Sequence, residues 1–212
     1  MHREVLTKRA AELFPALAQF SGFYLAGGTG LAVQIGHRLS VDFDLFCRRE
    51  IKRSLLPKVE KVFSDASSIV PLVNNADELT ALVDGIKVTF LSYPFPVVDP
   101  LEAYENVPVL SIREIAATKA YTIGRRGAYK DYVDLYFVLS EGHATLGEII
   151  DLAAIKFDND FNARLFLEQL VFLDDVEDTE VHILRAAVTR GEVLKFLASA
   201  AKWYAEEFAA DI

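Results

Sequence analysis

The sequence contains a single cysteine, Cys47, so no disulfide bond can form within the chain, as is usual in a reducing compartment. No apolar run approaches the ~20 residues that a membrane-spanning helix needs, and the N-terminus is amphipathic and charged, unlike a signal peptide. Basic residues are also scarce, with 22 Lys and Arg against 31 Asp and Glu. We therefore expect a cytoplasmic protein without a membrane partner, for which nucleic acid is at most a local or transient partner.

The patterns that are present divide the chain near residue 110. Residues 1–110 mix helical and strand patterns, whereas residues 111–212 read only as helices. This predicts an α+β fold, with a mixed β-sheet and flanking helices followed by a C-terminal helical bundle that contributes to the site. The expected helices are 3–20, 29–36, 51–64, 111–122, 128–140, 145–156, 160–173 and 180–209. The expected strands are 22–26, 41–46, 67–73, 78–84 and 86–93. Residues 94–108, with three prolines, are expected to form a loop.

A glycine turn between the first expected strand and the next helix is the most informative local feature. Glycines at such a turn let backbone N–H groups approach a phosphate, and the helix N-terminus adds a favourable dipole. The alternative is an ordinary tight turn in which the threonine caps the helix. The residues concerned are Gly27, Gly28 and Thr29.

Two carboxylates follow on the next strand. Asp42 and Asp44 alternate with apolar residues, so they project to one side of the strand with Cα atoms roughly 6–7 Å apart. Neighbouring carboxylates repel unless a cation lies between them, and hard oxygen ligands suit Mg²⁺. The alternative is a solvent-facing edge with charged residues. Arg38 and Ser40 precede the pair, and either they contact phosphate or they fix the loop by hydrogen bonds.

The helical half carries further polar candidates. Lys119 emerges between small residues of one expected helix, where it reaches a phosphate or is simply solvated. Asp131 and Asp134 lie one turn apart on the next helix, where they position a lysine, stabilise the helix N-terminus or complete a polar site. Two basic clusters are read as contacts for RNA or an acidic partner, or as solvated faces; they are Arg48, Arg49, Lys52 and Arg53, and Arg125, Arg126 and Lys130.

Taken in order, these motifs resemble those of the AbiEii/AbiGii-type nucleotidyltransferases of the DNA polymerase β-like superfamily. The members are often toxins of type IV toxin–antitoxin or abortive-infection systems. The resemblance covers roughly residues 20–140. The matching pattern reads Gly27-Gly28-Thr29, His37-Arg38-x-Ser40-x-Asp42-x-Asp44-x-Phe46, Lys119 and Lys130-Asp131-x-x-Asp134-Leu135.

The resemblance implies a set of roles. The triphosphate of an NTP would be held by Gly27, Gly28, Thr29, Arg38, Ser40 and Lys119. Asp42 and Asp44 would coordinate Mg²⁺, and Asp131 would be a further catalytic group. The reaction would be in-line attack of an acceptor hydroxyl, for example on RNA, at the α-phosphate with loss of pyrophosphate. A cognate antitoxin would be a protein partner.

One departure from the superfamily pattern leaves an alternative open. Such enzymes usually carry a third carboxylate on a later strand, but here that strand offers Lys87, Thr89 and Leu91 on the corresponding face. The rival interpretation is therefore a nucleotide- or partner-binding module of the same fold with weakened catalysis. A phosphotransferase acting on a small molecule or a protein is a further enzymatic alternative.

Overall fold

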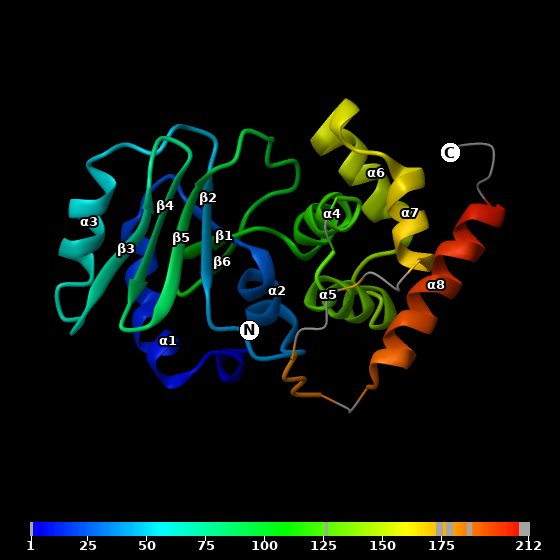
Figure 1. The fold of residues 1–212 in the computed structure, drawn as a ribbon, viewed down its shortest axis with the longest axis horizontal. Helices are drawn as coiled ribbons and strands as arrows, with labels where there is room; N and C mark the ends of the chain where they lie inside the picture. Colours follow the sequence, from blue (N-terminus) through cyan, green and yellow to red (C-terminus); the bar gives the residue numbers. More distant parts are fainter. Residues whose placement is uncertain (1, 126, 173–175, 177–179, 186–187, 208–212) are drawn as a thin grey trace. The chain divides into compact units, whose positions relative to one another are not determined.

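The computed structural model describes residues 2–125, 127–172, 176, 180–185 and 188–207. The chain forms two compact units, Met1–Pro96 with Pro100–Ser111, and Val97–Asp99 with Ile112–Ile212. The first contains a β-sheet with helices, and the described part of the second is helical (Figure 1). The predicted α+β fold with a mixed sheet and C-terminal helices is confirmed. The assignment of functional domains to 1–110 and 111–212 stays a prediction.

The sheet of the first unit has seven strands in the order β3-β4-β5-β2-β1-β7-β6. β2 pairs with β5 in parallel, as does β1 with β7, and the remaining neighbours are antiparallel. The strands span, in chain order, Tyr24–Ala26, Phe43–Cys47, Ile69–Asn74, Glu78–Val83, Ile86–Ser92, Glu102–Tyr104 and Val107–Val109.

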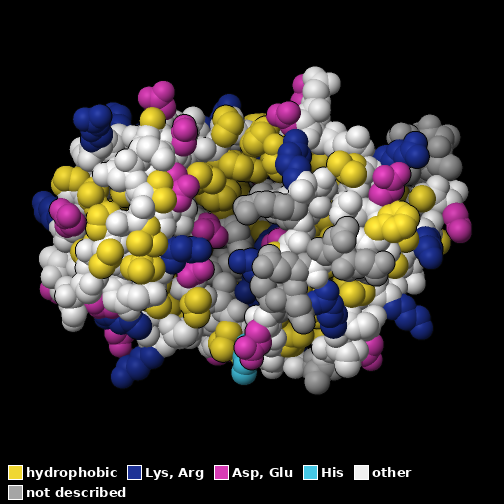
Figure 2. Space-filling view, in the orientation of Figure 1, with side chains coloured by type: hydrophobic (Ala, Val, Ile, Leu, Met, Phe, Trp, Pro, Cys, Tyr) yellow, Lys and Arg dark blue, Asp and Glu magenta, His cyan; other side chains and the backbone are white. Residues whose placement is uncertain are grey.

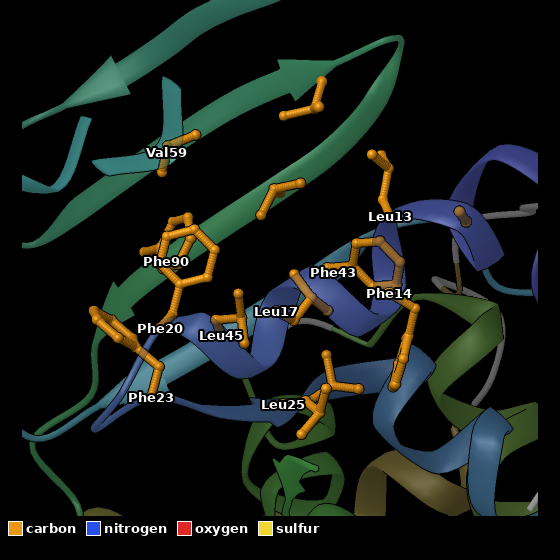
Figure 3. Close-up of a cluster of buried hydrophobic side chains, with 14 of the residues drawn as sticks. Leu13, Phe14, Leu17, Phe20, Phe23, Leu25, Phe43, Leu45, Val59 and Phe90 are labelled. Atoms are coloured by element: carbon orange, nitrogen blue, oxygen red, sulfur yellow. The ribbon is translucent and has the colours of Figure 1, made fainter. Parts of the chain in front are cut away.

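Large apolar side chains cover one face of this sheet (Figure 3). Phe43 and Leu45 of β2 and Phe90 of β5 point into this core, and aromatic residues of the N-terminal segment pack on them. Phe20 lies 4.7 Å from Phe90 between ring centroids, a contact that contributes ~0.5–1.5 kcal/mol beyond its buried area. Because side chains alternate along a strand, burying Phe43 and Leu45 turns Asp44 to the opposite face.

The N-terminal helix is shorter than predicted. Residues 3–20 form a 3₁₀ turn, η1 (Arg3–Val5), the helix α1 (Lys8–Leu13) and a second 3₁₀ segment, η2 (Phe14–Gln19). The hydroxyl of Thr7 accepts a hydrogen bond from the Ala10 N–H and so begins α1, whereas Pro15 near the start of η2 lacks an N–H. Helix α3 (Leu55–Val62) is also shorter than predicted, since the N–H of Ile51 donates to the carbonyl of Ala76 in the turn between β3 and β4 instead.

The sequence predicted one hairpin of the sheet, β4–β5, and missed another, β6–β7. The predicted turn at Asp84-Gly85 joins β4 to β5, with φ values of 49° and 81°. The prediction that 94–108 is a loop is wrong in part, because it contains β6 and all but the last residue of β7. Glu105 and Asn106 adopt the left-handed conformation of such a turn, and Val109 pairs with Leu25 of β1. That pairing is long-range and leaves no periodic pattern in three-residue strands.

The described part of the second unit contains helices α4 (Ile112–Ile123), α5 (Tyr129–Ser140), α6 (Leu146–Phe157), α7 (Ala163–Val171) and α8 (Arg190–Glu207), with a 3₁₀ turn η3 (Asp158–Asp160). The predicted helix 180–209 is wrong at its start, since α8 begins at Arg190 and contains Gly191 in its first turn. Within the described parts of the chain, no helix is long and apolar enough to cross a membrane.

Candidate functional site

The turn from β1 into helix α2 (Gly27–Ile35) brings the start of that helix against a carboxylate. Gly27 has φ +62°, and a Cβ added there would lie 2.4 Å from Oδ2 of Asp44. Asp44 is paired with Ala26, the last residue of β1, so the sheet register places it beside this turn. Only glycine fits here without strain or collision. The N–H groups of the first helical turn have no partner within the helix, so anionic groups are favoured near them.

Asp42 lies on the same side of the sheet as Asp44 and forms an ion pair with a lysine. Its Oδ2 is 3.2 Å from the Nζ of Lys87 on β5, and both side chains are partly exposed to solvent. Asp44 is paired in parallel with Thr89, two residues along the same strand. The ammonium of Lys87 thus occupies a position where positive charge is stabilised by Asp42.

This donor set fits a divalent metal that also binds a nucleotide. The two carboxylates supply hard oxygen ligands, and Mg²⁺ usually takes one or two carboxylates, substrate phosphates and water. In the part of the chain that the structure describes, no group of three or more His, Cys, Asp or Glu residues is arranged to hold a metal. Asp42 and Asp44 would therefore need phosphate oxygens to complete a coordination shell.

Thr29 and Ser40 hold the loop that carries Asp42. Thr29 lies inside α2, two residues after its start, and is 2% exposed. Its hydroxyl donates to the backbone carbonyl of Asp42 and therefore accepts from Ser40 Oγ, at 2.6 Å. The Thr29 hydroxyl thus bonds this loop and does not cap the helix, so any contribution of Thr29 to phosphate comes from its backbone N–H.

Arg38 is buried, whereas a contact with a bound phosphate would need its guanidinium to reach the site. Its Nη1 donates to the carbonyl of Leu39 at 3.0 Å, and the residue is 6% exposed. This hydrogen bond agrees with the loop-fixing interpretation, and a phosphate contact of Arg38 stays a prediction.

Lys119 in the helical unit is held by two carboxylates. Its Nζ lies 2.6 Å from Oδ1 of Asp131 and 2.7 Å from Oδ2 of Asp134, joining α4 to α5. All three side chains are buried, so Lys119 is not an ordinary solvated lysine. Asp131 Oδ2 also accepts from the Ala128 N–H, 3.3 Å away, at the start of α5. Asp131 thus positions the lysine and stabilises the helix N-terminus at once.

The neighbouring Tyr132 keeps its proton over the physiological range. Burial, followed by the charge of Asp131, raises the pKa of Tyr132 to about 12. Its hydroxyl donates to the carbonyl of Gln169 at 3.3 Å. The tyrosine therefore acts as a neutral packing and hydrogen-bonding group beside the lysine cluster.

Comparison with known proteins adds the family to this geometry. The model of the family described as nucleotidyl transferase AbiEii toxin, Type IV TA system, matches residues 11–98 and 81–207. The chain belongs to this AbiEii family. An uncharacterized protein of Aquifex aeolicus (strain VF5), aq_aa25, is 32% identical over 174 residues, covering 81% of this chain and 83% of the relative.

Solved structures similar to this AbiEii family member share its fold. JHP933 from Helicobacter pylori aligns with a TM-score of 0.58 at 17% identity, over 97% of this chain and 96% of that one. MenT4, the nucleotidyltransferase toxin Rv2826c from Mycobacterium tuberculosis H37Rv, aligns with a TM-score of 0.56 at 16% identity, over 91% and 84%. At these identities the likeness concerns the fold alone.

The sequence motifs predicted most of the polar groups described above but missed two arrangements. Glu114 of α4 is fully buried and accepts from Nζ of Lys156 at 2.5 Å. Thr80 and Glu78 of β4 form hydrogen bonds next to Thr89, and the sequence motifs did not point to them. Their alternation with buried Leu79 and Ala81 was the available signal, because it places them on the face that carries Asp44.

Proposed function

We propose that this chain is an Mg²⁺-dependent nucleotidyltransferase that transfers a nucleotide from an NTP to an acceptor hydroxyl. The observation that carries the proposal is the carboxylate of Asp44 lying against Gly27 at the start of α2. It joins a metal ligand to a phosphate-binding helix terminus within one short segment. Family membership supports the same reaction class.

In the first unit, different residues would bind the phosphates and the metal. The backbone N–H groups of Gly28 and Thr29 would bind phosphate oxygens, and Asp42 and Asp44 would hold the metal. Thr29 and Ser40 would keep Asp42 in place through the hydrogen bonds described above. When bound, Mg²⁺ would stabilise negative charge on the phosphates and on the attacking and leaving oxygens. On binding, Lys87 would leave Asp42 for a phosphate.

We propose that Lys119 and Asp131 are functional residues of the helical unit. A lysine held between two carboxylates has a restricted orientation, which suits a point charge that contacts a phosphate. Asp131 would act by orienting Lys119.

RNA is the acceptor that the surface charges support best. Six Lys and Arg residues and two Glu residues lie within residues 48–61, a local charge of +4 in a chain of net charge −9. Figure 2 shows such basic side chains where the chain enters α3. A small cavity in this segment, ≈ 180 Å³, is lined in part by Arg49, Lys52 and Lys58. Polyanion backbones bind such surfaces in a salt-dependent way.

The biological setting that follows is a cytoplasmic toxin of a type IV toxin–antitoxin or abortive-infection system, counteracted by a cognate antitoxin. The similarity in fold to the MenT4 toxin and the description of the family both support this setting.

The reaction is tested by incubating the protein with each labelled NTP, Mg²⁺ and total RNA or protein. We expect transfer of a nucleotide with release of pyrophosphate, reduced by at least about 100-fold in Asp44→Asn. Asp65→Asn, which removes an exposed carboxylate of the same unit, is the matched control and should retain activity. Absence of transfer with all four NTPs, or undiminished transfer by Asp44→Asn, would refute the enzymatic proposal.

The alternative, a binding module with weakened catalysis, is supported by Thr89 standing opposite Asp44. It predicts Mg²⁺-dependent NTP binding without turnover. Product mass separates a phosphotransferase from a nucleotidyltransferase, since the first adds a phosphoryl group and the second a nucleotide.

A further inference from the structure

Three side chains form a hydrogen-bonded line across the face of the sheet that carries Asp44. Glu78 and Thr80 lie two residues apart on β4, with Thr80 Oγ1 2.5 Å from Oε1 of Glu78. Thr80 is paired with Thr89 of β5, and their hydroxyl oxygens are 3.2 Å apart. Thr89 is in turn paired with Asp44 of β2. The line therefore starts beside a metal-binding candidate and ends on a carboxylate two strands away.

Its hydrogen bonds have a defined direction. A carboxylate only accepts hydrogen bonds, so the single proton of the Thr80 hydroxyl is donated to Glu78. The Thr80 oxygen is then the acceptor of the 3.2 Å contact, and Thr89 is its donor. Both hydroxyl protons are thus donated along the line toward Glu78, and the lone pairs of Thr89 Oγ1 are not used within the line.

The middle of the line is dry, whereas its ends are accessible. Thr80 is 5% exposed, so water does not compete readily for its hydroxyl. Thr89 and Glu78 are both partly exposed. A proton that enters at Thr89 therefore has a protected route to a carboxylate that can release it to solvent.

We propose that Thr89, Thr80 and Glu78 form the proton-exit path for the acceptor hydroxyl in the nucleotidyl transfer; the inference rests on the proposed function. As the acceptor oxygen bonds to the α-phosphorus and pyrophosphate leaves, the acceptor proton passes to Thr89 Oγ1. The proton of Thr89 passes to Thr80, and that of Thr80 passes to Oε1 of Glu78. Each hydroxyl gains one proton and loses one, so only Glu78 changes protonation.

In this path Glu78 on β4 takes the role of the carboxylate that related enzymes carry on the strand corresponding to β5. Glu78 lies on β4, two strands away from the strand that carries Asp44, and the described residues contain no three-acid metal group. Glu78 receives the proton through two hydroxyls, so it acts on the acceptor only through Thr80 and Thr89. Since general-base assistance contributes roughly 10²–10⁴-fold, loss of the path should be visible in kcat.

The test compares substitutions that keep or remove single links of the path. Thr80→Val, which preserves shape and removes the hydroxyl, and Glu78→Gln should each lower kcat about 10- to 100-fold. Thr80→Ser keeps the hydroxyl and should retain most of the activity. Thr122→Val, which removes a hydroxyl that donates to the backbone of α4, is the matched control for the Thr→Val change. NTP affinity, measured by calorimetry, should be the same in all of them.

A rescue makes the test independent of folding. In the Glu78→Gln background, Thr89→Glu places a carboxylate directly opposite Asp44 and should restore kcat by about 10-fold or more. Multi-proton solvent isotope effects should be present in the wild type and absent in the rescued double variant.

The outcomes separate the two proposals. If the wild-type chain transfers nucleotide and both Thr80→Val and Glu78→Gln transfer it equally well, the proton path is refuted while the proposed function stands. Loss of activity that follows the loss of NTP affinity or of thermal stability would also refute the path. If the wild type transfers nothing with any NTP, both proposals fail.

Discussion

Gly27 is a residue whose backbone conformation and the space beside its Cα both exclude a side chain. A positive φ disfavours any residue with a Cβ, and the carboxylate of Asp44 occupies the space a Cβ would take. The close approach of Asp44 to α2 therefore depends on this one glycine.

We predict that Gly27→Ala lowers the free energy of unfolding by about 1–3 kcal/mol and abolishes Mg²⁺–NTP binding. Denaturant unfolding and calorimetry measure the two effects. Two alanine substitutions separate strain from collision. Gly85→Ala, at φ +81° with nothing nearby, reports strain alone, and Gly191→Ala, in the first turn of α8 with nothing nearby, should be neutral or stabilising. A Gly27→Ala protein that binds NTP normally would contradict the assignment of this turn.

The environment of Lys119 differs from that of an ordinary surface lysine. The sequence left a solvated lysine and a phosphate contact as alternatives. The structure buries its ammonium between Asp131 and Asp134, so it is paired with protein carboxylates. Removing the lysine alone would leave two buried carboxylates facing each other, which is strongly unfavourable.

Between elements, a second buried ion pair ties α4 to α6. The side chains of Glu114 and Lys156 are completely buried, and Oε1 of Glu114 also accepts hydrogen bonds from the N–H groups of Val98 and Asp99. The Val97–Asp99 segment belongs to the same compact unit as these helices. Glu114 thus links two helices and a connecting segment within that unit.

We predict that Lys156→Met destabilises the protein by about 3–5 kcal/mol, because Glu114 would keep its buried charge without its partner. Glu114→Gln should be costly for the same reason in reverse. The double variant should lose less than the sum of the two single losses, by about 1–3 kcal/mol, as unfolding measurements on all four proteins would reveal. Strict additivity would show that the pair is not coupled.

The start of α6 gives a prediction for pH. The backbone N–H of Thr145, and then its hydroxyl, donate to the carboxylate of Glu148 and hold the pKa of Glu148 below its ordinary value of 4.5. A lowered folded-state pKa stabilises the fold above the unfolded-state pKa, and this contribution is lost as pH falls through the folded-state pKa. Glu148→Gln should therefore be less stable than the wild type at pH 7.

The stability gap between wild type and Glu148→Gln should close as pH falls from about 5 toward 3. Urea unfolding at a series of pH values measures this gap. Thr189 and Glu192 at the start of α8 have the same arrangement, so Glu192→Gln is a matched second case. A gap that stays constant with pH would contradict the charge-based explanation.

For the whole molecule, ligand binding is the property that connects the site to stability. A ligand that binds only the folded state adds RT ln(1 + [L]/Kd), which is about 2.7 kcal/mol at a concentration of 100 Kd. We predict that an NTP raises the melting temperature only when Mg²⁺ is present. Asp44→Asn should lose this shift, whereas Glu78→Gln should keep it. A shift of equal size without Mg²⁺ would contradict the proposed metal–nucleotide site.

Local patterns were sufficient for much of the fold. The alternation of Phe43 and Leu45 with Asp44 predicted β2 and the face of its carboxylate, and Asp84-Gly85 predicted the β4–β5 hairpin. Those features depend on residues close in sequence. The β6–β7 hairpin was missed because β7 is held by pairing with β1, more than 80 residues away.

The sequence by itself determined which residue types occupy the motifs at residues 27–46 and 119–135, the α+β class and the family. These depend on residue types in a fixed order. Only the tertiary structure decided which partners the polar groups have. Lys119 forms ion pairs with two buried acids, Thr29 bonds to the Asp42 loop, and Glu78 is linked to Thr89 through Thr80. Side-chain hydrogen bonds and ion pairs act over about 3 Å, and strand register and helix packing alone bring residues distant in sequence within that range.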